Sequence, residues 1–284
     1  MATYGAVLKT KRDKVYIALK DDFSSMDNAL KALGTDHVDF LMFNRHFPFS
    51  ASDARIAETF EKLKNQGKVR FAGLTSHAMV KSTTAAGLQS GYYNVVMPVL
   101  NQPNLEAMTE ELRLAQQRGV GVMAMKTMKG LKGLDSEVAY LKKLLSNPAV
   151  TTVTKGMGSF DMFDAYLAAL KEPLTAAEDR ALYRYAQVNR SNNCMMCDEC
   201  KQACPLGVEV STVLRCKDYY YDQMGDRETA LRTYRDIPLD KVGSVACRLC
   251  KQCEPACPNG IAIAERLLAA SEVFSGLARG VVRV

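Results

Sequence analysis

The sequence predicts an α/β protein, with a parallel sheet in its first part and a smaller α-helical segment behind it. Two observations predict this. Residues 1–172 alternate short apolar runs with helical patterns, which is the order expected of successive strand–helix units. Residues 173–284 hold all nine cysteines of the chain, most of them at short and regular spacings. We therefore expect two domains, 1–172 and 173–284.

The first domain contains six candidate strands. Each is short, rich in β-branched or large apolar residues and mostly without polar alternation, as in parallel strands covered on both faces. Helix ends are readable between them: Ser52 and Ser159 are expected to cap helices, and Gly67 and Gly119 to end helices. The candidate strands are Val15–Leu19, Val38–Phe43, Val69–Leu74, Val95–Val99, Val120–Met125 and Thr151–Thr154.

A bridge, residues 171–193, joins the two domains and contains little Gly or Ser. Thr175 and Glu178 have the spacing of a capping box, in which each residue satisfies a backbone N–H near the other. The bridge is therefore expected to be a packed helix rather than a flexible linker.

Two cysteine runs, 194–205 and 247–258, each read C-x2-C-x2-C-x3-C-P. This is the bacterial spacing for [4Fe–4S] clusters, and the fourth cysteine of each run ligates the cluster of the other run. Three thiolates at intervals of three residues can surround one corner of a cubane. One cluster is therefore expected on Cys194, Cys197, Cys200 and Cys257, and the second on Cys247, Cys250, Cys253 and Cys204.

The repeat continues beyond the ligands, because residues 205–214 match residues 258–267. Both halves are expected to turn at a Pro-x-Gly and to place an apolar pair before a helix. Structural zinc sites usually present pairs of thiolates, and disulfide frameworks belong to small secreted chains, so two clusters are the preferred interpretation. The remaining Cys216 is expected to be a buried free thiol. Tyr219–Tyr221 and Tyr234 are expected to pack over the clusters rather than bind a ligand.

Composition excludes several function classes. Apolar residues make up 48% and charged residues 24%, no apolar run is long enough to span a membrane, and no signal peptide opens the chain. With oxygen-sensitive thiolates, this predicts a cytoplasmic protein. The formal net charge of +6 fits the docking of an acidic electron carrier, of ferredoxin or flavodoxin type, or of an anionic cofactor. The basic residues are scattered and accompany no nucleic-acid-binding motif.

Five segments of the first domain together resemble the aldo-keto reductase family. Their order matches the third, fourth, fifth, seventh and eighth strands of that family, and the cysteine-rich part is similar to the ferredoxin-type extension of one subgroup. That subgroup carries Met-Lys where Met125-Lys126 stands. The segments are residues 11–20, 38–43, 67–77, 119–126 and 151–159.

The resemblance implies a TIM-type (β/α) barrel of which this chain contains six βα units, with the site at the carboxyl ends of the strands. It implies NADP(H) as cofactor and a small-molecule carbonyl substrate. Lys20 stands where the family lysine belongs, and Asn44 stands in place of the family histidine, with His46 nearby. The implied cofactor-binding residues are Ser76, Lys126, Lys155, Gly156, Gly158 and Ser159.

The family aspartate and tyrosine have no counterpart in this sequence, and Tyr4 matches an ordinary helix position better. Two functions therefore stay open. One is an iron–sulfur oxidoreductase with nicotinamide chemistry in the barrel mouth. The other is an electron-transfer protein whose barrel is not catalytic. Six parallel strands also leave two unpaired edges, which predicts self-association or poor solubility.

Overall fold

The computed structural model describes residues 2–21, 23–44, 54–77, 79–128, 131 and 133–278. Internal contacts divide the chain into two compact units, Met1–Leu182 and Tyr183–Val284, here called unit 1 and unit 2. This division falls within helix α8 (Ala176–Asn189), ten residues beyond the boundary expected from the sequence. No helix in the described part of the chain is long and apolar enough to cross a membrane.

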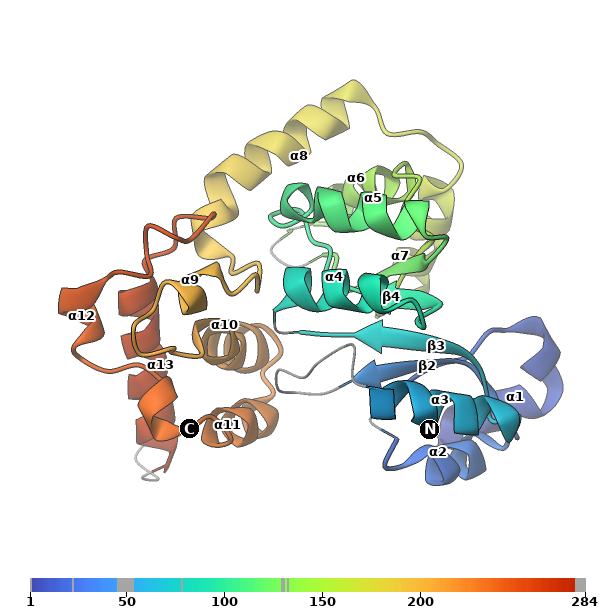
Figure 1. Cartoon of the computed structure of the whole chain (residues 1–284). Helices are drawn as coiled ribbons and strands as arrows, with labels where there is room; N and C mark the ends of the chain where they lie inside the picture. The colour runs from blue at the N-terminus through green and yellow to red at the C-terminus, as the bar shows by residue number, and fades with distance from the viewer. Residues whose placement is uncertain are drawn as a thin grey trace. The chain divides into compact units, whose positions relative to one another are not determined.

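Unit 1 is built on a half-barrel of parallel strands. Six strands form one sheet in the order in which they occur along the chain, and every neighbouring pair is parallel (Figure 1). This confirms the predicted α/β class and the six strand–helix units. The strands are β1 (Ala18–Asp21), β2 (Val38–Asn44), β3 (Val69–Thr75), β4 (Val95–Met97), β5 (Gly121–Ala124) and β6 (Thr152–Val153).

Helices cover one face of this sheet. Phe43 of β2 stacks on Phe23 with ring centroids 4.7 Å apart, and Leu74 of β3 lies so close to Gly87 of α4 that a Cβ there would be 2.3 Å from it. The helices of unit 1 are α1 (Ala2–Lys11), α2 (Met26–Leu33), α3 (Ala54–Asn65), α4 (Val80–Ser90), α5 (Thr109–Gln117), α6 (Leu134–Leu145) and α7 (Phe160–Ala169), with 3-10 turns at Arg12–Lys14 and Glu106–Met108.

One set of alternate strand residues, to which Lys20, Met42 and Gly73 belong, faces the concave side of the half-barrel. Register pairs Lys20 with Met42 and Met42 with Gly73, so these three share a face. Lys20 Nζ lies 3.3 Å from Met125 Sδ, which follows β5, four strands away along the sheet. Because only the inside of a curved sheet brings such distant strands together, this face is the barrel interior.

The first strand begins later than the sequence suggests, at Ala18 instead of Val15. The reason is Asp39, whose carboxylate accepts a hydrogen bond from the Ile17 N–H at 2.8 Å and binds Arg12 and Arg70. Burial would raise the pKa of Asp39, but the backbone hydrogen bond and the two guanidinium groups outweigh it and hold the pKa below its usual value.

The helix caps follow the sequence where the structure describes them. Ser159 Oγ accepts a hydrogen bond from Met162 N at 3.2 Å, which caps α7. Thr175 N donates to Glu178 Oε2 at 2.7 Å, and Glu178 N donates to Thr175 Oγ1 at 3.2 Å, so the capping box of α8 is confirmed. Ser52 lies outside the described residues. Tyr4 belongs to α1 and is exposed, as expected of an ordinary helix residue.

Unit 2 is α-helical. The second half of α8 leads into short helices around a buried apolar core, to which Val210, Val213, Ile263 and Phe274 belong. Its elements are the 3-10 turn Arg190–Asn192, α9 (Glu199–Gln202), α10 (Val210–Leu214), a π-helix (Arg215–Gln223), α11 (Arg227–Arg235), the 3-10 turn Leu239–Lys241, α12 (Cys247–Cys250) and α13 (Ile263–Ala278).

Candidate functional site

The two cysteine runs of unit 2 end in the same turn. Gly207 N donates to Cys204 O at 3.0 Å, and Gly260 N donates to Cys257 O, also at 3.0 Å. The two glycines have left-handed φ values of 60° and 62°, which side chains rarely adopt. The predicted Pro-x-Gly turns are therefore present in both halves.

The apolar pair after each turn is also repeated. Val208 and Val210 are 1% exposed, and Ile261 and Ile263 are 3% and 1% exposed. Helices α10 and α13 begin at the matching residues Val210 and Ile263 and pack against each other. The sequence repeat is therefore a structural duplication.

Three other cysteines lie near Cys200. Burial first, and then the nearby Cys194, Asp198, Cys197 and Cys257, raise the pKa of the Cys200 thiol well above its usual value. These side chains are thus close enough for their charges to interact. Cys257 comes from the other run.

A second group forms around Cys253. Burial and then Cys204 raise the pKa of Cys253 to about 11, with Cys247 contributing less. Here Cys204 is the member from the other run. Cys250, the remaining predicted ligand, is exposed.

A single metal ion is a poor fit to these groups. Among the described residues, no three His, Cys, Asp or Glu side chains are placed so that they could hold one ion. A zinc ion would draw its thiolates to about 2.3 Å from one centre. A four-iron cluster instead binds each thiolate to a different iron, so its ligands lie farther apart than those of one ion.

The residues between the ligands differ between the two runs. Met195 and Met196 are 5% and 1% exposed, whereas Leu249, which matches Met196, is 92% exposed. Asp198 is 3% exposed, and its counterpart Lys251 is exposed. The first run is therefore enclosed and the second lies at the surface.

The residue that follows the second cysteine nevertheless has the same conformation in both runs. Asp198 has a φ of 64° and Lys251 a φ of 48°, both left-handed. This conformation costs a residue with a side chain about 1–2 kcal/mol. Its presence at matching positions indicates that the ligand loops impose it.

Cys216 is 0% exposed and has no disulfide partner, which confirms the expected buried free thiol. It lies in the π-helix, and burial raises its pKa to about 12. The nearby aromatics pack into the core of unit 2, because Tyr221 and Tyr234 both contact Phe274.

In unit 1, the candidate catalytic Lys20 reaches the concave face of the half-barrel. The residue as a whole is exposed at the sheet edge, but its ammonium lies beside Met125 Sδ, which Thr75 Oγ1 also approaches at 3.6 Å. Loss of hydration around the ammonium lowers the pKa of Lys20.

Other polar groups lie at the carboxyl ends of the strands. Asn44 Oδ1 at the end of β2, Asn101 Oδ1 after β4 and Thr127 Oγ1 after β5 are buried without a hydrogen-bond partner among the described residues. Such atoms are costly unless a ligand or water satisfies them. Sequence reasoning missed Asn101 and Thr127, although both directly follow apolar strand runs.

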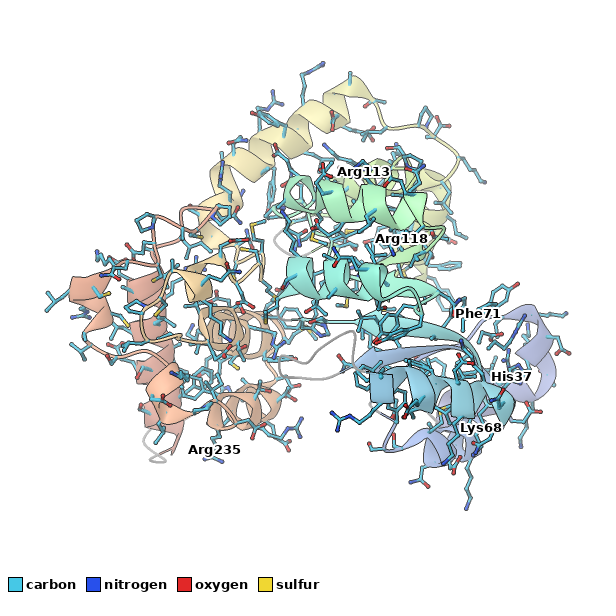
Figure 2. All side chains as sticks on the ribbon, viewed as in Figure 1. His37, Lys68, Phe71, Arg113, Arg118 and Arg235 are labelled. Carbon is cyan, nitrogen blue, oxygen red and sulfur yellow. The ribbon has the colours of Figure 1, made fainter. Side chains whose placement is uncertain are left out.

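The remaining residues that are expected at this end of the sheet differ in their exposure. Ser76 is 8% exposed, directly after β3, and Lys126 is half-buried with a left-handed φ of 52°. His46 lies outside the described residues. His37 and Lys68 precede β2 and β3, so they lie at the opposite, amino end of the sheet, as Figure 2 shows.

The expected phosphate-binding loop is engaged with the protein itself. Lys155 Nζ lies 3.4 Å from Glu137 Oε2 and 5.7 Å above the ring of Tyr166, whose hydroxyl donates to the same carboxylate. Gly156 and Gly158 have open space where a Cβ would stand.

A hollow of ≈ 380 Å³ adjoins this loop. Met157, Gly158, Ser159, Phe160 and Phe163 line it. Its large side chains are apolar, and Phe160 is 87% exposed. The lining therefore offers more apolar than anion-binding surface.

The comparisons with known proteins concern unit 1. Residues 2–142 match the aldo/keto reductase family. This match covers just under half of the chain, so it shows that the first part of the chain is similar to aldo/keto reductases. No curated protein sequence matches the chain.

Solved structures agree on the fold of unit 1. An aldo-keto reductase from Bacillus halodurans, in its apo form, is 22% identical with a TM-score of 0.52, over 64% of this chain and 75% of that one. A thermostable aldo-keto reductase crystallised with the inhibitor epalrestat is 19% identical with a TM-score of 0.51, over 64% and 76%. At these identities, the likeness shows the fold, a partial barrel, and carries no information about activity.

Proposed function

We propose that this chain is an iron–sulfur oxidoreductase that carries electrons on two [4Fe–4S] clusters in unit 2. The observation that supports the proposal is the sorting of the cysteines into two groups, each of which borrows its last member from the other run. A disulfide framework or a pair of independent zinc knuckles gives no reason for this exchange. The spacing of both runs supports the same centres.

The residues present fit such clusters. Each group combines thiols from a C-x2-C-x2-C loop with one thiol from a Cys-Pro-x-Gly turn, and the loops keep the same left-handed residue. When bound, the clusters supply one-electron transfer. The protein holds the thiolates, shields the first group and leaves the second accessible. Such thiolates persist in a reducing compartment, so we also propose a cytoplasmic location.

Metal analysis tests this directly. Anaerobically purified protein is expected to contain about eight iron and about eight sulfide per chain, because two four-iron clusters are held. Stoichiometric zinc without a brown chromophore would refute the proposal. Cys216→Ala serves as the control, since this cysteine is outside both groups and its removal is expected to leave the iron content unchanged.

A second candidate function is nicotinamide chemistry in unit 1. It is supported by Lys20, with its lowered pKa, and by the unpaired Asn44, Asn101 and Thr127 at the same end of the sheet. These groups fit the carboxamide of a nicotinamide ring. The phosphate end fits less well, because Lys155 is already paired with Glu137 and must exchange that ion pair for a phosphate.

NADPH binding separates the two candidates. Tight binding that is weakened by Thr127→Val or Asn101→Ala supports a nicotinamide site, and its absence supports an electron carrier with a non-catalytic barrel. Carbonyl reduction is expected to be slow, because a positioned proton donor typically contributes about 10²–10⁴-fold and Asn44 cannot transfer a proton. Ordinary turnover of simple carbonyls, abolished by Lys20→Met, would show that this expectation is wrong.

Self-association remains a separate prediction. Among the described strands, β1 pairs only with β2 and β6 pairs only with β5, so both edges of the half-barrel are open. Such edges can pair with another chain. Sedimentation at increasing concentration checks this, and a monomer at all concentrations would contradict it.

A further inference from the structure

Two exposed apolar side chains lie at the start of the second cysteine run. Val245 is 72% exposed and Leu249 is 92% exposed. Arg248 N bonds to Val245 O and Leu249 N to Ala246 O, so residues 245–249 form one helical turn that leads through α12. Val245 and Leu249 are four residues apart and therefore share a face of that turn. Cys250, a member of the second ligand group by the sequence rule, is exposed directly beside them.

The charge around these residues is basic. Residues 242–253 contain Arg248 and Lys251, both exposed, and no acidic side chain. The nearest acids along the chain are already engaged: Asp240 pairs with Lys241 at 3.2 Å, and Glu254 Oε1 accepts a hydrogen bond from Ala264 N at 3.0 Å. We call Val245, Arg248, Leu249 and Lys251 the α12 patch.

The matching part of the first run offers no such surface. Its counterparts of Arg248, Leu249 and Lys251 are Met195, Met196 and Asp198, all at most 5% exposed. The Pro-x-Gly turns of the two runs are alike, so the difference lies between the ligands, in the residue types and in the position of the short helix, α9 or α12. One ligand group is reachable from solvent through an apolar and basic surface, and the other is enclosed.

We propose that the α12 patch is the docking site for a small acidic one-electron carrier protein. This inference rests on the proposed clusters and adds the route by which electrons enter. Cys204, Cys247, Cys250 and Cys253 would hold the cluster nearest this patch, and that cluster would accept the one electron that the carrier gives up, with no bond made or broken. Exposed apolar residues with a basic rim suit a transient partner, since opposite charge steers the encounter and the apolar centre excludes water.

Stopped-flow reduction of the purified holoprotein by a reduced, acidic [2Fe–2S] ferredoxin tests the patch. The double variant R248E/K251E is expected to lower the second-order rate constant at low salt by about tenfold or more, because like charges suppress steering. Added salt is expected to lower the rate constant of the unaltered protein and to reduce the difference between its rate constant and that of R248E/K251E. V245E, which lies outside the cysteine run and spares the ligand loop, is expected to slow reduction as well.

The matched control is R232E/R235E on α11, which makes the same change in net charge within unit 2. Figure 2 labels Arg235, which lies on α11, apart from α12 in the view of Figure 1. The control is expected to retain most of the rate. Binding of a gallium-substituted, redox-inactive ferredoxin, measured by calorimetry, gives a second readout without electron transfer. V245E is expected to weaken this binding, and V188E is expected to leave it unchanged. Val188 is the exposed apolar control, at 75%.

The outcomes distinguish the two levels of the proposal. Protein without iron and sulfide overturns the clusters and with them this inference. Protein with both clusters, but with equal rates for R248E/K251E and R232E/R235E, overturns the docking site alone. A rate that rises with salt overturns the acidic character of the carrier. Slow reduction of R248E/K251E supports the docking site where the iron content of the variant and its reduction by dithionite match those of the unaltered protein. Where they do not match, the reduction rate of V245E tests the docking site instead.

Discussion

The two cysteine runs of unit 2 share their closing turn and have opposite surroundings. Both end in a Cys-Pro-x-Gly turn with a hydrogen bond of 3.0 Å, and both carry a left-handed residue after the second cysteine. Yet Met196 is 1% exposed where Leu249 is 92% exposed. The ligand spacing fixes what each run can hold, whereas the residues between the ligands fix what can reach it.

This difference has a physical basis in the side chains themselves. Methionine is flexible and fills irregular gaps in an apolar interior, which suits Met195 and Met196. Arginine and lysine keep their charged ends in water, so Arg248 and Lys251 hold the second run at the surface. A duplicated unit has thus become an enclosed site and an accessible site without a change in its turns.

The largest expected effect comes from removing the exchanged ligands. Cys257→Ser is expected to damage the centre that contains Cys194, Cys197 and Cys200, and Cys204→Ser the other one, because each run lends its fourth cysteine. Each variant should lose about half of the eight iron atoms. Iron analysis and electron paramagnetic resonance of the two variants check this.

Damage confined to the run that carries the substitution would refute the exchange. The grouping of Cys200 with Cys257 and of Cys253 with Cys204 would then reflect packing of the thiols without shared ligation. Cys216→Ala, which removes a thiol outside both groups, is the control.

The next effect tests the enclosure of the first run. Met196→Ala is expected to lower the free energy of unfolding by about 2–5 kcal/mol, because it leaves a cavity in a buried site. Leu249→Ala at the matching position should change it by no more than about 0.5 kcal/mol, since that side chain is exposed. The chain contains no Trp, so unfolding in urea is followed by circular dichroism. Equal losses in both variants would mean that Leu249 is covered in solution.

Much of this could be predicted from the sequence. The cysteine spacing, the Pro-x-Gly turns, the buried pair after each turn and the six parallel strands all follow from local patterns with a known period. The exposure difference between the runs depends on what packs around them, and spacing carries no such information. The available signal for this difference was the pair of residues between the first two cysteines, which is Met-Met in the first run and Arg-Leu in the second.

The site in unit 1 was harder to predict for the same reason. The resemblance to the family places Lys20 at its catalytic position, but the pairing of Lys155 with Glu137 joins residues on different elements. Likewise, the start of β1 was misplaced because the carboxylate of Asp39 takes the Ile17 N–H. Contacts between distant residues decide such details, and a single sequence does not display them.

A smaller effect tests the shared backbone. Gly207→Ala and Gly260→Ala are each expected to cost about 1–2 kcal/mol, because both glycines have a left-handed φ and alanine is strained there. Gly260 has no atom within 4 Å of an added Cβ, and Gly207 has only Lys241 Nζ at 4.0 Å, so the cost comes from the backbone and should be nearly equal. Urea unfolding measures both. A clearly larger loss in one variant would mean that the two turns are not equivalent.

The smallest effect concerns the left-handed Lys251. Asparagine tolerates this conformation better than lysine, so Lys251→Asn is expected to raise the free energy of unfolding of unit 2 by less than about 1 kcal/mol. Arg248→Asn is the matched control: it removes the same charge from the α12 patch, but at a helical residue where asparagine costs about 0.5 kcal/mol. Urea unfolding of the iron-loaded protein measures both variants. A gain in the free energy of unfolding for Lys251→Asn and a loss for Arg248→Asn would show that the backbone at Lys251 is strained. A loss in both variants would instead indicate that the lysine charge itself stabilises the second run, and that its exposure serves the fold as well as access.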